Sequence, residues 1–296
     1  MIPSRLITAM ITPFRDNGDV DFETAKKLAI ALAKSGSNGI LLGGTTGESP
    51  TLSDEEKLKL FETVKNNVGN SVTVIAGTTD NNTAKSIELS RSAEDLGVDA
   101  LLLTVPAYNK PTQGGLIKHF NDIADSVNIP GILYNVPSRT SLNMTAETTL
   151  KLAQHENIAG IKEASSDLSQ IAEIITQTID SDFKVWSGND DETFSIMTLG
   201  GFGVVSVASN IIGLQIQSMM GSILEGDIES AAFQHRHLLP LFQALFWITN
   251  PILIKRSLNL SGFNVGGLRL PMKDSGEFGE KFAKLLGQHD IDVTKS

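Results

Sequence analysis

The chain has 296 residues, of which 41% are hydrophobic and 20% charged, the composition of a globular protein with an ample core. Its net charge of −10 argues against nucleic acid or an anionic membrane surface as a partner, because both bind basic patches. The absence of cysteine excludes disulfides, thiolate metal sites and cysteine nucleophiles. Because the sequence shows neither a basic-then-apolar leader nor an apolar run of about 18 residues, we expect a cytoplasmic protein.

Eight short apolar segments along the chain are typical of buried strands. They cover residues 6–11, 39–42, 72–76, 100–105, 131–134, 158–162, 183–186 and 203–207. Their starts lie about 20 to 34 residues apart, roughly the length of one strand–helix unit with its loops. Continuous apolar strands that alternate with helices predict a parallel sheet covered on both faces. Eight units favour an α/β fold with a closed (β/α)₈ TIM barrel, with an open doubly wound sheet as the alternative.

Helix signals complete the predicted architecture. Ser53 and Glu56 form the pattern of a capping box, and further helix starts are expected near Asp21, Asn82, Thr145 and Asp167. From residue 211 onward the strand signals stop, and segments 213–224, 227–248, 250–259 and 277–287 have helical character. We therefore expect a barrel over residues 1–210 and a helical C-terminal region over 211–296 that packs on it. The site should lie where the strands end, on the loops that lead into the helices.

Lys162 is the first candidate site residue, because it lies near the end of the apolar strand 158–162. Lysine is rarely buried, so a lysine within a strand needs a reason. A desolvated lysine loses its proton more readily and can attack a carbonyl to form a Schiff base. The alternative is a lysine at a strand end that reaches to water or pairs with Glu163 or another nearby acid.

Other strand ends are polar as well. The loop after the second strand carries Thr45 and Thr46 among glycines, which suits a small anion but is also an ordinary turn into a helix. The only two tyrosines, Tyr108 and Tyr134, both lie at or just after a strand end, where their hydroxyls can relay protons. Arg139 offers a planar fork suited to a carboxylate, or it is a surface arginine.

The sequence carries no recognisable cofactor or metal motif. The five histidines lack metal-ligand spacing, and no P-loop or dinucleotide fingerprint is present. The run 189–192, an asparagine followed by three acids, is interpreted as a helix start after the seventh strand, with acids favoured in the first turn. We therefore expect neither a catalytic metal nor a nucleotide cofactor.

The ordered motifs resemble the dihydrodipicolinate synthase family, within the pyruvate-dependent class I aldolase superfamily. The resemblance runs almost end to end and is carried by Thr12-Pro13 and by residues 44–49, 74–77, 108–111, 134–140, 160–164, 187–190, 250–251 and 268–271. It implies condensation of pyruvate with L-aspartate 4-semialdehyde in lysine and diaminopimelate biosynthesis. The expected covalent intermediate is a Schiff base between Lys162 and pyruvate, without a separate cofactor.

The resemblance also implies roles for individual residues. Lys162 would be the nucleophile, and Tyr134, Thr45 and Tyr108 the proton relay, with Tyr108 supplied by a neighbouring subunit. The chain would then act as a homodimer or as a homotetramer built from two dimers.

The same resemblance implies how the substrates are held. Thr46 and Thr45 would hold the pyruvate carboxylate, and Arg139 the carboxylate of the semialdehyde. Gly188 and Val205 would complete the walls near the aldehyde.

Two alternatives and two departures from the family pattern accompany this hypothesis. The chain could instead be a pyruvate-dependent aldolase or lyase of a sugar acid, or a non-catalytic barrel that binds pyruvate. Lysine-inhibited members usually carry a second tyrosine where this chain has Ala107, and a glutamate where it has Lys85. Because a cation repels the lysine ammonium and Ala107 offers no ring, we expect lysine not to inhibit this protein appreciably.

Overall fold

A computed structural model of the chain describes residues 2–295 and shows one closed barrel of parallel strands. Each strand pairs with its neighbours in sequence, and β8 pairs with β1 to close the barrel. The strands are β1 (Leu6–Ala9), β2 (Gly39–Leu42), β3 (Thr73–Gly77), β4 (Ala100–Thr104), β5 (Gly131–Asn135), β6 (Ile158–Glu163), β7 (Lys184–Ser187) and β8 (Gly203–Ser206). The predicted TIM barrel is confirmed, and the open sheet is excluded because β1 and β8 are paired.

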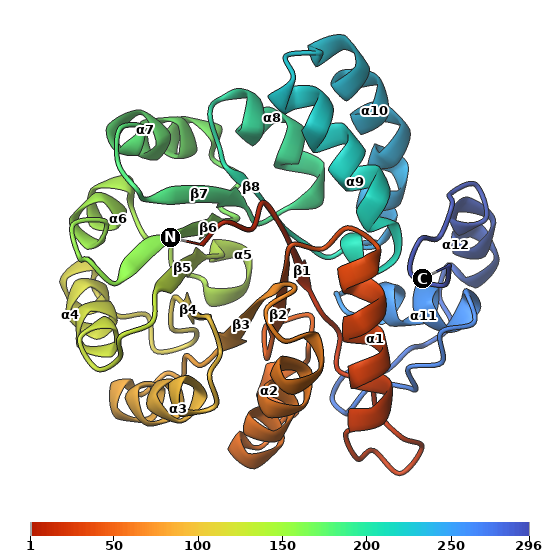
Figure 1. The fold of residues 1–296 in the computed structure, drawn as a ribbon, viewed down its shortest axis with the longest axis horizontal. Coiled ribbons are helices and arrows are strands. Elements are labelled where there is room, and N and C mark those ends of the chain that lie inside the picture. Colours follow the sequence, from red (N-terminus) through yellow and green to blue (C-terminus); the bar gives the residue numbers. More distant parts are fainter. Residues whose placement is uncertain (1, 296) are drawn as a thin grey trace.

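A ring of helices surrounds the barrel (Figure 1). It comprises α1 (Phe22–Lys34), α2 (Asp54–Val68), α3 (Thr83–Asp95), α4 (Gln113–Ala124), α5 (Pro137–Thr140), α6 (Ala146–Leu152), α7 (Leu168–Thr178), α8 (Thr193–Thr198) and α9 (Ser209–Leu224), with short 3₁₀ turns at Ser49–Thr51 and Asp190–Glu192.

The helix starts read from the sequence are confirmed. Ser53 accepts a hydrogen bond from the Glu56 amide, and the Glu56 carboxylate accepts one from the Ser53 amide, which is a complete capping box. The four other predicted N-caps each accept from a backbone N–H of the first turn; they are Asp21, Asn82, Thr145 and Asp167. These helix starts could be predicted because a cap depends on residues only two or three positions apart.

The alternation of side chains along each strand separates two hydrophobic layers. One layer fills the barrel interior and includes Ile7, Leu41, Ile75, Ile132, Trp186 and Val205. The larger layer lies between the barrel and its helices and includes Leu6, Ile40, Val74, Leu133 and Val204. Because the parity of a strand position determines its layer, Lys162 belongs to the interior and Glu163 to the outer side.

The C-terminal part of the chain completes and extends the ring. Helix α9 lies between α8 and α1 and packs against β1, and α10 (Ile228–Ala244) packs against α9 (Figure 1). Helix α11 (Ile252–Leu260) packs against α9, and α12 (Gly279–Leu286) packs against α10 and α11. Each of the four expected C-terminal helices has a counterpart, and α9 begins earlier than predicted, at Ser209.

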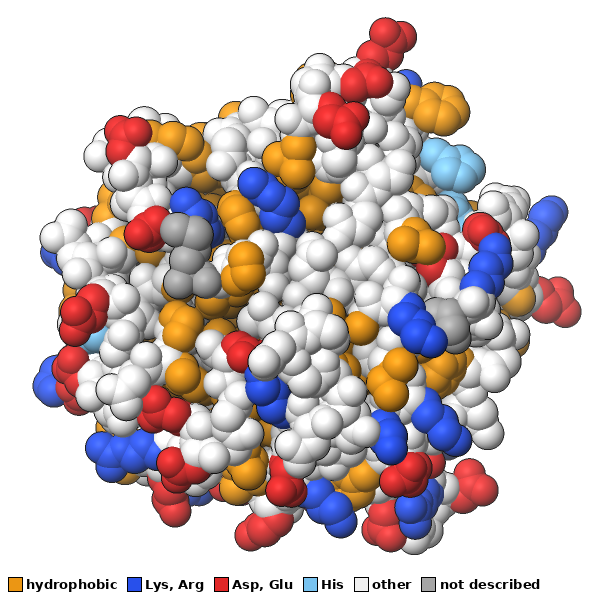
Figure 2. Space-filling view, in the orientation of Figure 1, with side chains coloured by type: hydrophobic (Ala, Val, Ile, Leu, Met, Phe, Trp, Pro, Cys, Tyr) orange, Lys and Arg blue, Asp and Glu red, His pale blue; other side chains and the backbone are white. Residues whose placement is uncertain are grey.

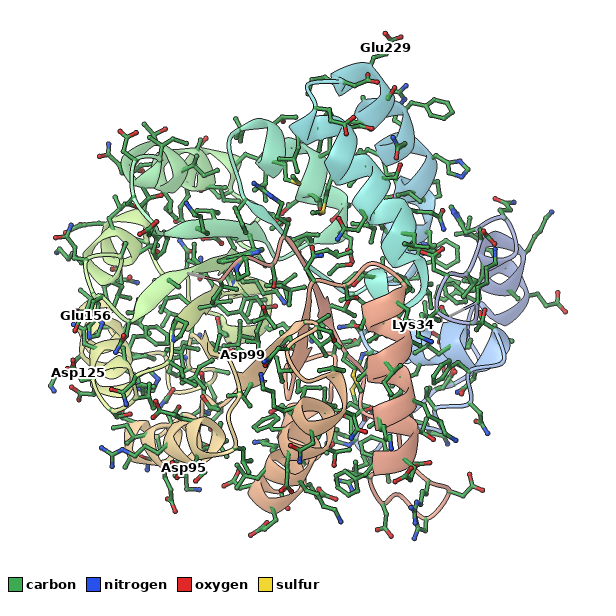
Figure 3. The ribbon with its side chains drawn as sticks, viewed as in Figure 1. Lys34, Asp95, Asp99, Asp125, Glu156 and Glu229 are labelled. Atoms are coloured by element: carbon green, nitrogen blue, oxygen red, sulfur yellow. The ribbon has the colours of Figure 1, made fainter. Side chains whose placement is uncertain are left out.

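The face shown in Figure 2 carries acidic and basic side chains interspersed around its periphery. Figure 3 labels Lys34, Asp95, Asp99, Asp125 and Glu156, all at helix ends or on connections that lead into strands. They mark the rim opposite to the one where the strands end. None of the helices within residues 2–295 is long and apolar enough to cross a membrane.

Candidate active site

Lys162 lies inside the barrel, near the carboxyl end of β6. Its neighbour in register on β5 is Tyr134, and the Lys162 Nζ lies 4.1 Å from the centre of the Tyr134 ring. The side chain is 5% exposed, so it does not reach to bulk water. Glu163 projects to the other side of the sheet, so the alternative in which these two neighbours pair is wrong.

Burial changes the acidity of Lys162. Desolvation lowers its pKa to about 7, against an opposing attraction from Asp190, and Arg139 lowers it further. A large fraction of the amine is therefore neutral near pH 7. This is the protonation state that attacks a carbonyl carbon.

Tyr134 is buried beside the lysine and remains a neutral phenol at pH 7. Burial raises its pKa to about 12, Arg139 lowers it, Glu163 raises it, and a hydrogen bond with Thr45 lowers it. A protonated hydroxyl next to a neutral amine can give a proton to a departing oxygen and take one back. A proton relay through Tyr134 would need a hydrogen-bonding partner of this kind.

The loop after β2 brings Thr45 and Thr46 to the same rim. Thr46 is 3% exposed, and its Oγ1 accepts a hydrogen bond of 2.9 Å from Asn250 Nδ2. The loop is fixed on its other side by Thr12, whose hydroxyl donates to the Gly47 carbonyl at 2.7 Å. A β-hydroxyl held in this way presents a defined hydrogen-bonding geometry to a ligand.

A cavity of about 490 Å³ opens above these residues. Its walls are formed by Thr45, Thr46, Tyr134, Val136, Ser138, Arg139, Lys162, Gly188, Asn189, Val207, Phe246, Trp247, Ile248, Thr249 and Asn250. A second cavity of about 320 Å³ shares Thr45, Val136 and Arg139 with the first and extends to Ala107. Arg139 thus borders both cavities, with an exposed side chain free to meet an incoming anion.

Gly188 lies in the cavity wall, where the backbone approaches β6 closely. Its amide donates to the Glu163 carbonyl at 2.7 Å, and a Cβ on it would come within 2.7 Å of the Ala164 Cβ. Only glycine fits there without displacing β6.

Val205 lies in the packed barrel interior with Tyr134 and Trp186. The residue that lines the cavity from this part of the chain is Val207, two positions further on. The structure thus brings six of the eight predicted residues to the cavity wall: Thr45, Thr46, Tyr134, Arg139, Lys162 and Gly188.

Tyr108 lies apart from this group. Its side chain is 92% exposed, with a backbone φ of 69°, and within the described chain it is not among the residues that line either cavity. An exposed tyrosine at the rim is unusual for a side chain of this size.

Two residues that sequence reasoning did not assign a role lie close to the chemistry. Asp190 was read only as part of a helix start, and a 3₁₀ turn does begin there. Its carboxylate is also buried and accepts from the Ser206 hydroxyl and from the amides of Val207 and Ala208 at 3.0 Å. Asn250 belonged to a motif of the resemblance, and the structure shows its amide in contact with Thr46.

Comparison with known protein families shows which family this chain belongs to. The model of the dihydrodipicolinate synthetase family matches residues 2–288. The chain belongs to this family. A 4-hydroxy-tetrahydrodipicolinate synthase from Dehalococcoides mccartyi is 54% identical over 273 residues, which cover 92% of each chain.

Solved structures of dihydrodipicolinate synthases agree with the fold over its whole length. One from Bacillus anthracis, DapA-2, is 41% identical with a TM-score of 0.92, covering 100% of this chain and 99% of that one. A chloride-inhibited enzyme from Acinetobacter baumannii, solved in complex with pyruvate, is 35% identical with a TM-score of 0.93, covering 99% of both chains. Within residues 2–295, no group of three or more His, Cys, Asp or Glu side chains is arranged to hold a metal ion.

Proposed function

We propose that this chain is a lyase that condenses pyruvate with L-aspartate 4-semialdehyde to give 4-hydroxy-tetrahydrodipicolinate, the reaction after which its relatives are named. The observation that carries the proposal is the buried Lys162, whose pKa is lowered to about 7 and whose Nζ lies 4.1 Å from the centre of the Tyr134 ring. Family membership over residues 2–288 supports the same reaction. This function implies a cytoplasmic enzyme of lysine and diaminopimelate biosynthesis.

In the first half-reaction, the neutral Lys162 amine attacks the keto carbon of pyruvate. Tyr134 protonates the resulting hydroxyl, which leaves as water and yields an iminium. The iminium withdraws electrons from the methyl group, so a methyl proton can pass to the Tyr134 phenolate and an enamine forms. In this scheme the iminium formed by the Lys162 amine serves as the electron sink, and we propose that no separate cofactor or metal takes part.

In the second half-reaction, the enamine carbon attacks the aldehyde of the second substrate. The new alkoxide takes a proton through the relay of Tyr134, Thr45 and Tyr108. Attack of the semialdehyde amino group on the iminium carbon then closes the ring and releases Lys162. Arg139 would hold the semialdehyde carboxylate, while Thr46 and Thr45 hold that of pyruvate.

We further propose that the working form is a homodimer or a tetramer of two dimers, because the relay needs Tyr108 from a second copy. The exposure of this tyrosine in the single chain, 92%, supports such an arrangement. Gly188 and Val207 would line the aldehyde side of the cavity, with Val205 packed behind them.

Reductive trapping tests this function. The chain is incubated with pyruvate and borohydride, with or without prior addition of L-aspartate 4-semialdehyde, and peptides are analysed by mass spectrometry. We expect a pyruvyl adduct on Lys162 that disappears when the semialdehyde is added first. Lys255 is the internal control, because burial also lowers its pKa, to about 8, but it is paired with Glu48 away from the cavity and should stay unlabelled.

The other outcomes separate the alternatives. An adduct that the semialdehyde leaves intact would keep the Schiff-base chemistry and transfer the acceptor to another aldehyde, such as a sugar-acid fragment. Pyruvate binding without any adduct would favour the non-catalytic barrel.

A further inference from the structure

The C-terminal region reaches into the cavity at Asn250, 204 residues away in sequence from the threonine that it contacts. Asn250 is 4% exposed and Thr46 is 3% exposed, and both line the cavity that contains Lys162. The contact is a single hydrogen bond of 2.9 Å from Asn250 Nδ2 to Thr46 Oγ1.

The direction of this hydrogen bond determines what the Thr46 hydroxyl can do. A hydroxyl has one proton to donate and two lone pairs that accept. Because the amide N–H occupies a lone pair of Oγ1, the hydroxyl proton remains available to a different acceptor. An amide nitrogen cannot take that proton back, so the contact biases Thr46 toward donation.

A second observation points to a ligand at the same place. Asn250 Oδ1 is buried and has no hydrogen-bond partner among residues 2–295. A buried acceptor without a partner is destabilising, because it has given up its hydrogen bonds to water. Rotating the amide would satisfy Oδ1 with the Thr46 proton, but it would leave the NH₂ group unpaired instead. A hydrogen-bond donor that arrives with the bound substrate would explain why Asn250 Oδ1 is left without a partner in the free chain.

The position of Asn250 is fixed by its surroundings. It precedes α11, and Lys255 on that helix lies 2.6 Å from the Glu48 carboxylate, at the end of the loop that contains Thr46. Both side chains of this ion pair are 2% exposed. The donor and the hydroxyl are therefore held together by two contacts between the same pair of segments.

We propose that Asn250 is a positioning residue that directs the Thr46 hydroxyl proton at the pyruvate carboxylate. The C-terminal region would thereby contribute to recognition of the first substrate. The inference rests on the proposed function, since pyruvate supplies the carboxylate. On this proposal, Asn250 affects the affinity for pyruvate by acting through Thr46.

Asn250→Asp tests the proposal, because the variant keeps the shape of the side chain but can only accept hydrogen bonds when ionised. The carboxylate would take the Thr46 proton and turn it away from the substrate. We expect half-saturation of trapping to need about ten- to a hundredfold more pyruvate. This is the change in affinity that the loss of one hydrogen bond to a charged group produces. The turnover number and the KM for the semialdehyde should change less than about threefold, the signature of lost ground-state binding.

Thr46→Val and the double variant separate the two residues. If Asn250 acts through Thr46, the effects on pyruvate affinity will be far from additive, because Thr46→Val already removes the proton that Asn250 directs. Additive effects would overturn the proposal. A Thr46→Val variant with unchanged pyruvate affinity would also overturn it. This second test does not depend on whether a variant at position 250 folds.

Asn157→Asp is the matched control. Asn157 is half-buried, and its Nδ2 donates to the Val127 carbonyl at 2.9 Å, on the opposite rim. Its substitution should lower the melting temperature and leave pyruvate affinity unchanged. A wild-type chain that forms no pyruvyl adduct would contradict the proposed function itself. A wild-type adduct with an unchanged pyruvate requirement in Asn250→Asp would contradict only the present inference.

Discussion

Lys162 shows how one buried side chain acquires its chemistry from position alone. An interior strand position removes water from the amine, and desolvation brings its pKa to about 7. Because only the neutral amine attacks pyruvate, the rate of trapping should follow the neutral fraction, which rises with pH. We expect the initial rate of adduct formation with cyanoborohydride to fall about tenfold per pH unit well below pH 7 and to level off above about pH 8.

Mass spectrometry of Lys162 peptides after short pulses, at fixed sub-saturating pyruvate, measures this dependence. A lysine with an ordinary pKa would instead show a rate that continues to climb toward pH 10. Lys162→Arg provides the background, since a guanidinium cannot form the adduct.

Arg139 is expected to act on the second substrate only. Its exposed guanidinium borders both cavities and suits a bidentate contact with a carboxylate. Removing the partner of a buried carboxylate should cost on the order of 2–4 kcal/mol. We therefore predict that Arg139→Ala raises the KM for the semialdehyde far more than the pyruvate concentration needed for trapping. Equal losses for the semialdehyde and for pyruvate would contradict the role assigned to Arg139. Arg91→Ala, remote on α3, is the control.

Two positions bear on regulation, and one of them lies at the second cavity. Ala107 lines this cavity, and Lys85 is exposed on the first turn of α3. Neither offers a ring or an anion to the ammonium groups of free lysine, so we predict no appreciable inhibition at sub-millimolar lysine. Steady-state rates measured over a lysine titration test this directly. The double variant Ala107→Tyr, Lys85→Glu should gain sensitivity, whereas strong inhibition of the wild-type chain would contradict the prediction.

At the scale of elements, a buried ion pair joins the C-terminal helices to the loop after β2. Lys255 Nζ lies 2.6 Å from Glu48 Oε1, donates to the Gly267 carbonyl at 2.7 Å, and lies 4.0 Å from the centre of the Phe14 ring. The Arg269 amide donates to the other Glu48 oxygen at 3.0 Å. The loop that carries Thr45 and Thr46 is therefore held by residues more than two hundred positions away.

Lys255→Met should leave the Glu48 carboxylate buried and unpaired, which typically costs about 3–5 kcal/mol. Urea unfolding at fixed protein concentration would measure the loss in the free energy of unfolding. Combining it with Glu48→Gln removes the isolated charge, so the double variant should recover most of the stability. Lys151→Met is the control, because its pair with Glu147 is exposed and should contribute far less to stability. A double variant no more stable than Lys255→Met would refute this account of the pair.

The sequence predicted what local pattern determines and missed what folding brings together. Strand and helix positions follow from apolar runs and from caps a few residues apart, and the structure confirms these predictions at Ser53 and Asn82. The contact of Asn250 with Thr46 joins segments 204 residues apart, and no periodicity encodes it. Which of Val205 and Val207 faces the cavity depends on where β8 ends, which a run of apolar residues does not reveal.

At the scale of the whole molecule, the single chain holds two of the three proposed relay residues together. Tyr134 and Thr45 are joined by a hydrogen bond, while Tyr108 projects from the rim with 92% of its surface exposed. In a symmetric dimer a contact made by one copy is made by both, so each Tyr108 would complete the partner's site. Proton relay would then depend on association as well as on folding.

Mixing two inactive variants distinguishes a relay in trans from one within the chain. Tyr108→Phe keeps Lys162 but lacks the relay hydroxyl, and Lys162→Ala keeps Tyr108 but lacks the nucleophile. In a hybrid dimer, the site with Lys162 receives Tyr108 from its partner and is complete, while the other site lacks both groups. Random reassociation of equal amounts should therefore restore about a quarter of the wild-type activity, since about one site in four is complete. If Tyr108 acted within its own chain, every site in the mixture would lack one of the two groups and mixing would restore nothing.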